Sequence, residues 1–117
     1  MQTIFEKLDQ QILLSPEESQ LVQSVQSVCR DLIEPNAKKY DETGDFPWEN
    51  IEAINALGLN AMFIPEEYGG APLSYTSYLY CVREISKSCA STGIIWATNF
   101  HGMKPIIDFG TEEQKQR

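Results

Sequence analysis

The 117 residues include seventeen acidic and nine basic side chains, which gives a formal net charge of −8. This charge argues against a surface for nucleic acid or for an anionic membrane, because both kinds of binding depend on lysine and arginine contacts with phosphate. An apolar content of 42% with 22% charged residues is typical of a globular chain, and the length suits one domain over residues 1–117.

The N-terminus does not have the pattern of a targeting segment. It carries Glu6 and Asp9 and lacks the apolar core of a secretory signal and the arginines of a transit peptide, which predicts a cytoplasmic protein. The three cysteines, Cys29, Cys81 and Cys89, show no CxxC spacing. We therefore expect buried, reduced thiols rather than a metal site or a disulfide framework.

The first capping signals open two helices near the N-terminus. A threonine followed three positions later by a glutamate starts either a short helix or a frayed terminus over residues 3–12. Ser15 before Pro16, with a glutamate three positions after the serine, starts a second and more secure helix. Proline has no N–H and crowds the preceding turn, so Pro35 predicts that this helix ends or kinks near Ile33.

Two more helices are expected in the middle of the chain. One covers residues 48–57, with Asp45 near its cap and Gly58 in the left-handed position past its end. Residues 59–64 form an apolar connection, and residues 65–70 form a glycine turn. Ser74 caps the next helix, whose expected inward face is Tyr75, Tyr78, Leu79, Val82, Ile85 and Ser86.

The stretch from Ser91 to Gly110 is poor in charge and apolar on nearly every side of a helical wheel. Such a helix is normally buried, so we expect it to be the central helix of an all-α, bundle-like fold of up to about six helices. Its two charges and its proline argue against a membrane span. Ser91 or Thr92 is the expected cap, and Gly102 with Pro105 predicts a break or bend, with one helix to about His101 and another from Lys104 to Phe109.

A last capping box begins at Thr111 with Gln114. The helix that it opens has only six positions left, and isolated helices of this length are not stable in water. The sequence therefore predicts that this chain is the front piece of a longer polypeptide.

No catalytic or metal-binding group is assigned from the residues. His101 is the single histidine and has no partner at ligand spacing, which favours a satisfied polar residue over a metal ligand or a triad member. Glu66 and Glu67 are adjacent carboxylates in a turn, and such pairs are usually solvated.

One stripe of the central segment leaves two interpretations open. Trp96, Phe100, Met103 and Ile107 recur at helical spacing, and Asn99 lies beside them. The stripe is either ordinary core packing or one side of an apolar ligand slot with few polar groups.

Several stretches occur in an order that resembles one family: SPEE, DETGDFP, IPEEYGG, CASTG and FGTEEQKQR. This order and spacing, from about residue 15 to the end, resembles the N-terminal helical domain of acyl-CoA dehydrogenases. The resemblance implies a parent subunit with a middle β domain and a C-terminal helical domain, both absent from this chain. It also implies a homo-oligomer, a tetramer in the family, that passes electrons to a transfer partner.

The resemblance further implies that the parent binds FAD, mainly through the absent parts, and oxidises an acyl-CoA thioester between its α and β carbons. In the family a glutamate of the C-terminal half removes the α-proton while the β-hydride passes to the flavin. No catalytic residue of that reaction is in this chain, and no cofactor-binding or metal-binding residue is assigned in it.

Matching from Thr92 and Gly93, the resemblance implies that one wall of the acyl pocket falls on this chain, at Trp96, Asn99, Phe100 and Met103. The interval from Gly93 to Pro105 is shorter than in well-known short- and medium-chain members, which displaces the last two wall residues by one position. A tryptophan in the slot implies a short or shape-restricted acyl group.

Two other functions fit the same residues. A flavin-dependent monooxygenase of the same fold begins with a similar helical domain, and it differs by lacking the catalytic glutamate beyond residue 117. A stand-alone helical interaction module would bind no flavin and would use a partner to cover the face around Trp96.

Overall fold

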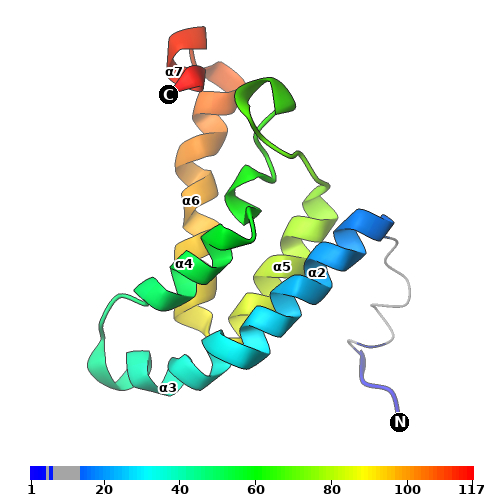
Figure 1. Cartoon of the computed structure of the whole chain (residues 1–117), viewed down its shortest axis with the longest axis vertical. Coiled ribbons are helices and arrows are strands. Elements are labelled where there is room, and N and C mark those ends of the chain that lie inside the picture. Colours follow the sequence, from blue (N-terminus) through cyan, green and yellow to red (C-terminus); the bar gives the residue numbers. More distant parts are fainter. Residues whose placement is uncertain (5, 7–13) are drawn as a thin grey trace.

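The computed structural model describes residues 1–4, 6 and 14–117, and this part of the chain is helical and has no strand (Figure 1). The all-α prediction is therefore confirmed. Its α-helices are α2 (Pro16–Val28), α3 (Glu34–Thr43), α4 (Trp48–Ala56), α5 (Tyr75–Ser88), α6 (Ala90–Phe109) and α7 (Glu112–Gln116). A π-helical turn, Cys29–Ile33, joins α2 to α3, and two 3-10 turns, Leu59–Ala61 and Glu66–Tyr68, lie between α4 and α5.

Helix α2 begins as its capping signals predict. The Ser15 hydroxyl accepts the Glu18 backbone N–H at 3.1 Å, and the Glu18 carboxylate accepts the Ser15 N–H at 3.2 Å. The same carboxylate accepts the backbone N–H of Ser74, the cap of α5, at 3.0 Å. One buried side chain therefore joins the starts of two helices. Thr3 and Glu6 also exchange capping hydrogen bonds, but the rest of the expected first helix lies outside the described residues.

Of the end or kink expected near Ile33, the helix end does not occur. The chain widens into the π-helical turn, where the N–H of Glu34 bonds to the carbonyl of Cys29, and then continues as α3. Proline fits the first turn of a helix, and Pro35 occupies that place in α3. The change of hydrogen-bond register makes room for its ring, so the proline shifts the helix instead of ending it. Helix α3 ends at Gly44, which has the left-handed φ of 69°.

Helix α4 lacks the cap that was expected for it. Pro47 occupies the cap position without a side-chain hydrogen bond, and the N–H of Asp45 instead donates to the Thr43 hydroxyl at 3.2 Å. The expected left-handed glycine is present, since Gly58 has a φ of 75°.

Helix α5 packs between α2 and α6 (Figure 1). Its buried residues are Ser77, Cys81, Glu84 and Ile85, whereas Tyr75 and Leu79 of the expected inward face are exposed. The helix is thus turned from the orientation expected for it. Its contact with α6 is close, because a Cβ on Gly93 would overlap the Ser86 hydroxyl. A glycine is what permits this approach.

Helix α6 is continuous through Gly102 and Pro105, so the expected break is absent. Ser91 and Thr92 do not cap it, because it begins at Ala90. The buried Thr92 hydroxyl instead accepts a hydrogen bond of 3.0 Å from the Asn50 amide of α4. No helix of the described residues is long and apolar enough to cross a membrane.

Only the first half of α6 is buried, contrary to the expectation of an enclosed central helix. Its buried residues end at Phe100, and the second half extends to α7, far from α3 (Figure 1). The core lies where α2, α5 and this first half meet. Its buried members are Val22, Val25, Cys29, Ile33, Ile54, Leu59, Met62, Cys81, Ile85, Cys89, Trp96 and Phe100. The three cysteines are buried and unpaired, as predicted.

Candidate functional site

The first two residues of the predicted wall, Trp96 and Phe100, lie in the core. Their ring centroids are 5.4 Å apart, and Tyr78 and Phe63 complete an aromatic cluster with them. The indole N–H of Trp96 donates to the Asn60 side-chain carbonyl at 3.1 Å. Trp96 is 0% exposed, so within this chain it has a complete set of neighbours.

The other two residues lie nearer to solvent. Asn99 is exposed on α6, one position before Phe100. Met103 is half-buried and lines a cavity of about 270 Å³. The structure therefore divides the predicted set into a core pair, an exposed amide and a thioether that faces a cavity.

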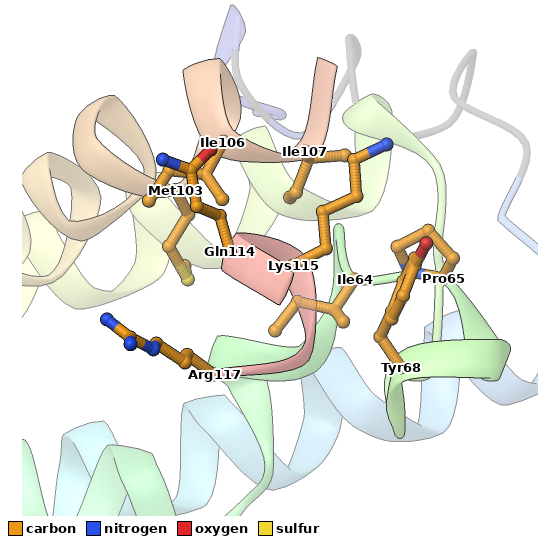
Figure 2. A pocket seen from close by; sticks show the side chains of 9 residues that line it. All are labelled: Ile64, Pro65, Tyr68, Met103, Ile106, Ile107, Gln114, Lys115 and Arg117. Atoms are coloured by element: carbon orange, nitrogen blue, oxygen red, sulfur yellow. The ribbon is translucent and has the colours of Figure 1, made fainter. Parts of the chain in front are cut away.

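Three segments surround this cavity (Figure 2). The second half of α6 provides three apolar side chains, the loop before α5 provides two apolar side chains and a tyrosine, and α7 with the residue after it provides the polar ones. The full lining is Ile64, Pro65, Tyr68, Met103, Ile106, Ile107, Gln114, Lys115 and Arg117. An apolar interior with a few polar groups at one side is the usual composition of a site for an apolar ligand.

Helix α7 is fixed beside the cavity by one polar contact and by its cap. The Tyr68 hydroxyl donates to the Glu112 carboxylate, whose oxygens lie at 2.8 and 3.0 Å. This hydrogen bond raises the pKa of Tyr68 to about 12, so the phenol stays protonated at neutral pH. Thr111 and Gln114 form the predicted capping box, with bonds of 2.9 and 3.3 Å.

Two of the three buried cysteines are poor nucleophiles. Burial raises the pKa of Cys29 to about 11 and that of Cys81 to about 12, which keeps both thiols protonated and unreactive. His101, Glu66 and Glu67 are exposed. Within the described ranges, no three histidine, cysteine, aspartate or glutamate side chains are grouped for a metal ion.

The described residues do not by themselves fit an FAD site. Each buried polar side-chain atom among them already has a hydrogen-bond partner within the chain, so none is left for a flavin or a pyrophosphate. Asn50 is an example, because it donates to Thr92 and accepts from Asn36. No step of a reaction is assigned to that cofactor on these residues.

The order of these features along the chain matches a known domain. Residues 15–117 match the family model described as acyl-CoA dehydrogenase, N-terminal domain. The chain belongs to the acyl-CoA dehydrogenase family. This match confirms the resemblance to the family. The matched region begins at Ser15, the cap of α2, and includes the residues of α6 that were predicted to form a wall, together with the cavity.

Curated relatives agree with this assignment, and their names include more than one activity on acyl-CoA compounds. The chain is 40% identical over 111 residues to the mitochondrial short-chain specific acyl-CoA dehydrogenase of Sus scrofa, covering 91% of this chain and 27% of that protein. It is 35% identical to the short-chain specific acyl-CoA dehydrogenase of Clostridium acetobutylicum, covering 89% of this chain and 28% of the relative. A 3-sulfinopropanoyl-CoA desulfinase of Paraburkholderia xenovorans is 34% identical, at 88% and 27% coverage. The chain thus spans about a quarter of these acyl-CoA dehydrogenase-family relatives.

Sequence reasoning missed most of the cavity lining. Ile64, Pro65 and Tyr68 were assigned only to a connection and a turn, and Lys115 only to a short terminal helix. The available signal was the apolar end of the connection beside a tyrosine. The connection lies close to α6 because the chain folds back on itself, and the backbone hydrogen bond from the Leu73 N–H to the Met62 carbonyl, at 2.8 Å, fixes this fold-back. No local sequence pattern encodes it.

Proposed function

We propose that this chain is the N-terminal domain of an FAD-dependent acyl-CoA dehydrogenase that forms an α,β double bond in an acyl-CoA thioester. The observation that carries the proposal is the match to the family over residues 15–117, and the names of the dehydrogenase relatives support it. The parent then has a middle β domain and a C-terminal helical domain, and these hold the catalytic carboxylate and most of the FAD site. A cytoplasmic homo-oligomer, a tetramer, that passes electrons to a transfer protein completes the proposal.

In this proposal the chain contributes one wall of the acyl pocket from α6. Met103 and Asn99 are the members of the wall that reach the surface, and Trp96 with Phe100 supports them from the core. The apolar cavity beside Met103 supports this division, because it leaves space for part of an acyl chain. Chain-length preference then depends more on Met103 than on Trp96.

The test uses the full-length natural protein. It is expected to purify with bound FAD, whose visible absorbance bleaches when an acyl-CoA is added without oxygen, and to form the enoyl-CoA. Substitution Met103→Ala removes side-chain volume at the cavity, so the relative rate with longer acyl-CoA chains should rise about two- to tenfold. Leu79→Ala is the matched control, because it truncates an exposed apolar side chain of α5 away from the cavity lining.

The outcomes separate the alternatives. A protein without flavin would refute the enzyme and favour a stand-alone interaction module. Bound flavin with oxygen-dependent product formation but no enoyl-CoA would indicate a monooxygenase. The desulfinase among the relatives makes loss of a sulfinate group from an acyl-CoA a further activity to assay. Unchanged chain-length preference in Met103→Ala would remove Met103 from the proposed wall while leaving the dehydrogenase intact.

A further inference from the structure

The corner between α3 and α4 presents two large aromatic side chains to solvent. Phe46 is 43% exposed and Trp48 is 64% exposed, and their ring centroids lie 4.5 Å apart. This corner is at the α3 end of the molecule, away from α7 and its cavity (Figure 1). Exposed tryptophan is uncommon on a free surface, and tryptophan is enriched among the residues that dominate binding energy at interfaces.

The corner has a rigid backbone. Pro47, between the two aromatic residues, is buried, and the N–H of Trp48 donates to the Phe46 carbonyl at 2.9 Å. Gly44 closes α3 just before it. Because the backbone is already held, a partner that covers the rings does not have to order this loop, which favours binding.

The surroundings of the two rings are acidic. Residues 38–52 contain five carboxylates and two lysines, and both lysines are already paired: Lys38 with Glu42 at 3.7 Å and Lys39 with Glu49 at 3.0 Å. In the described part of the chain, the remaining three carboxylates have no ion pair, and these are Asp41, Asp45 and Glu52.

Two of these carboxylates flank the aromatic residues in the sequence. Asp45 directly precedes Phe46, and Glu52 is four residues after Trp48 on α4. Residues four apart are neighbours on one face of a helix, so Glu52 and the indole share a face. We propose that this acidic aromatic corner, made by Asp45, Phe46, Trp48 and Glu52, is a docking surface for a basic segment of another protein that places an arginine on the Trp48 ring.

An exposed indole beside carboxylates favours arginine over lysine as the bound cation. Its guanidinium is flat, stacks on an indole face, and can donate to a carboxylate in the same plane, whereas an ammonium group is a strongly hydrated point charge. The same corner of a second copy of this chain carries the same negative charge, so the two corners would repel each other. The corner would also repel an anionic lipid surface. Charge therefore selects a basic protein segment over both.

The test measures binding of a short fluorescein-labelled peptide of alternating arginine and glycine to the full-length protein, at physiological salt. Trp48→Ala should weaken binding about tenfold, because the stacking surface is lost. Glu52→Gln and Asp45→Asn should each weaken it by about two- to fivefold. Trp48→Phe keeps a ring and should retain part of the affinity, and the same peptide with lysine should bind less tightly.

Controls separate this surface from general attraction to a negative protein. Glu66→Gln and Glu67→Gln remove exposed carboxylates of the 3-10 turn before Gly69 and should leave binding unchanged. Equal losses in these variants and in Glu52→Gln would overturn the proposal, as would unchanged binding in Trp48→Ala. Two further measurements test the other occupants. Oxidative footprinting of Trp48 before the peptide is added shows whether the indole is already covered. Sedimentation of Trp48→Ala shows whether the variant loses an oligomer that the wild type forms. A protected indole or a lost oligomer would assign the corner to an interface within the parent protein, contrary to the proposal.

Discussion

Glu18 shows how one side chain can define two helix starts. Its two oxygens accept the backbone N–H groups of Ser15 and Ser74, fifty-nine positions apart in the chain. These hydrogen bonds, with Ser74 as the main contributor, lower the pKa of the carboxyl below its usual value. The charged form is therefore the one that the folded state favours.

We expect Glu18→Gln to lower the free energy of unfolding by about 1–2 kcal/mol at neutral pH, because an amide replaces a charged acceptor of two N–H groups. A lowered pKa in the folded state adds stability above the unfolded pKa, and this contribution disappears as the pH falls through the folded value. The difference between wild type and variant should therefore shrink below about pH 4.5. Urea unfolding of both proteins across this range measures it.

The neighbouring exposed carboxylate provides the control for that measurement. Glu17→Gln changes the same charge at the first turn of α2 without touching Ser74. A constant difference between wild type and Glu18→Gln from neutral to acid pH would show that the double cap adds no pH-dependent stability.

At the scale of helices, the sequence predicted the starts better than the orientations. Caps such as Ser15, Ser74 and Thr111 depend on nearby residues only, and the structure has them as expected. Pro35 was expected to end or kink one helix, and Pro105 with Gly102 to break or bend another. Neither helix ends there, because the surrounding helix tolerates one missing N–H or changes register. Local propensity gives no measure of that tolerance.

The orientation of α5 could not be read from its own residues. Its three tyrosines lie on more than one side, and the face that became buried includes Ser77 and Glu84. Glu84 can be buried there because Arg83 and Lys87 pair with it at 2.9 and 3.4 Å. The choice between faces depends on how α2 and α6 pack, which is tertiary information.

In the described part of the chain, one side-chain hydrogen bond, between Tyr68 and Glu112, joins helix α7 to another element, in addition to its cap. We expect Tyr68→Phe to raise the amide hydrogen-exchange rates of residues 112–116 several-fold, because the Glu112 carboxylate loses its donor. The raised pKa of Tyr68 means that this contact persists at neutral pH and is lost as the pH rises towards about 12. Exchange measured by mass spectrometry on the full-length protein reports it.

The same experiment needs a tyrosine that has no such role. Tyr75 is 60% exposed at the start of α5, and Tyr75→Phe should leave exchange in α7 unchanged. Equal exchange in α7 of the wild type and Tyr68→Phe would show that the capping box alone holds the helix.

At the scale of the whole molecule, the described chain leaves much of α6 uncovered. Ile106 is 46% exposed and Phe109 is 88% exposed, on one face of α6 and one turn apart. A surface of this kind marks an interaction site or favours aggregation. The predicted wall of the acyl pocket follows the same division, since the stripe from Trp96 to Ile107 is core at its start and surface at its end.

The sequence pattern could identify that stripe but not where its burial changes. Helical periodicity is the same for a side chain against a core and for one against a cavity. After Phe100 the buried residues of α6 end, and Met103, Ile106 and Ile107 line the cavity instead, which is a property of helix lengths and packing. Whether the uncovered part binds an acyl chain stays a prediction.

We expect the 117-residue chain on its own to self-associate or to become molten, because its apolar α6 face has no cover. Phe109→Ser should weaken the association about tenfold, whereas Leu79→Ser on α5 should have a smaller effect. Sedimentation velocity with binding of a hydrophobic dye measures both. A monomer that melts cooperatively and gives dispersed NMR signals would contradict this expectation.

The two tryptophans occupy opposite environments, so the intrinsic fluorescence of the chain reports on both its core and its surface. Trp96 is fully enclosed by aromatic neighbours, whereas Trp48 faces water at an acidic corner. Emission from the first shifts to longer wavelength when the core opens. The carboxylates near the second attract caesium and repel iodide, so neutralising them should lower caesium quenching and raise iodide quenching of its emission. The emission wavelength and the quenching by ions together therefore distinguish loosening of the core from binding at the surface corner.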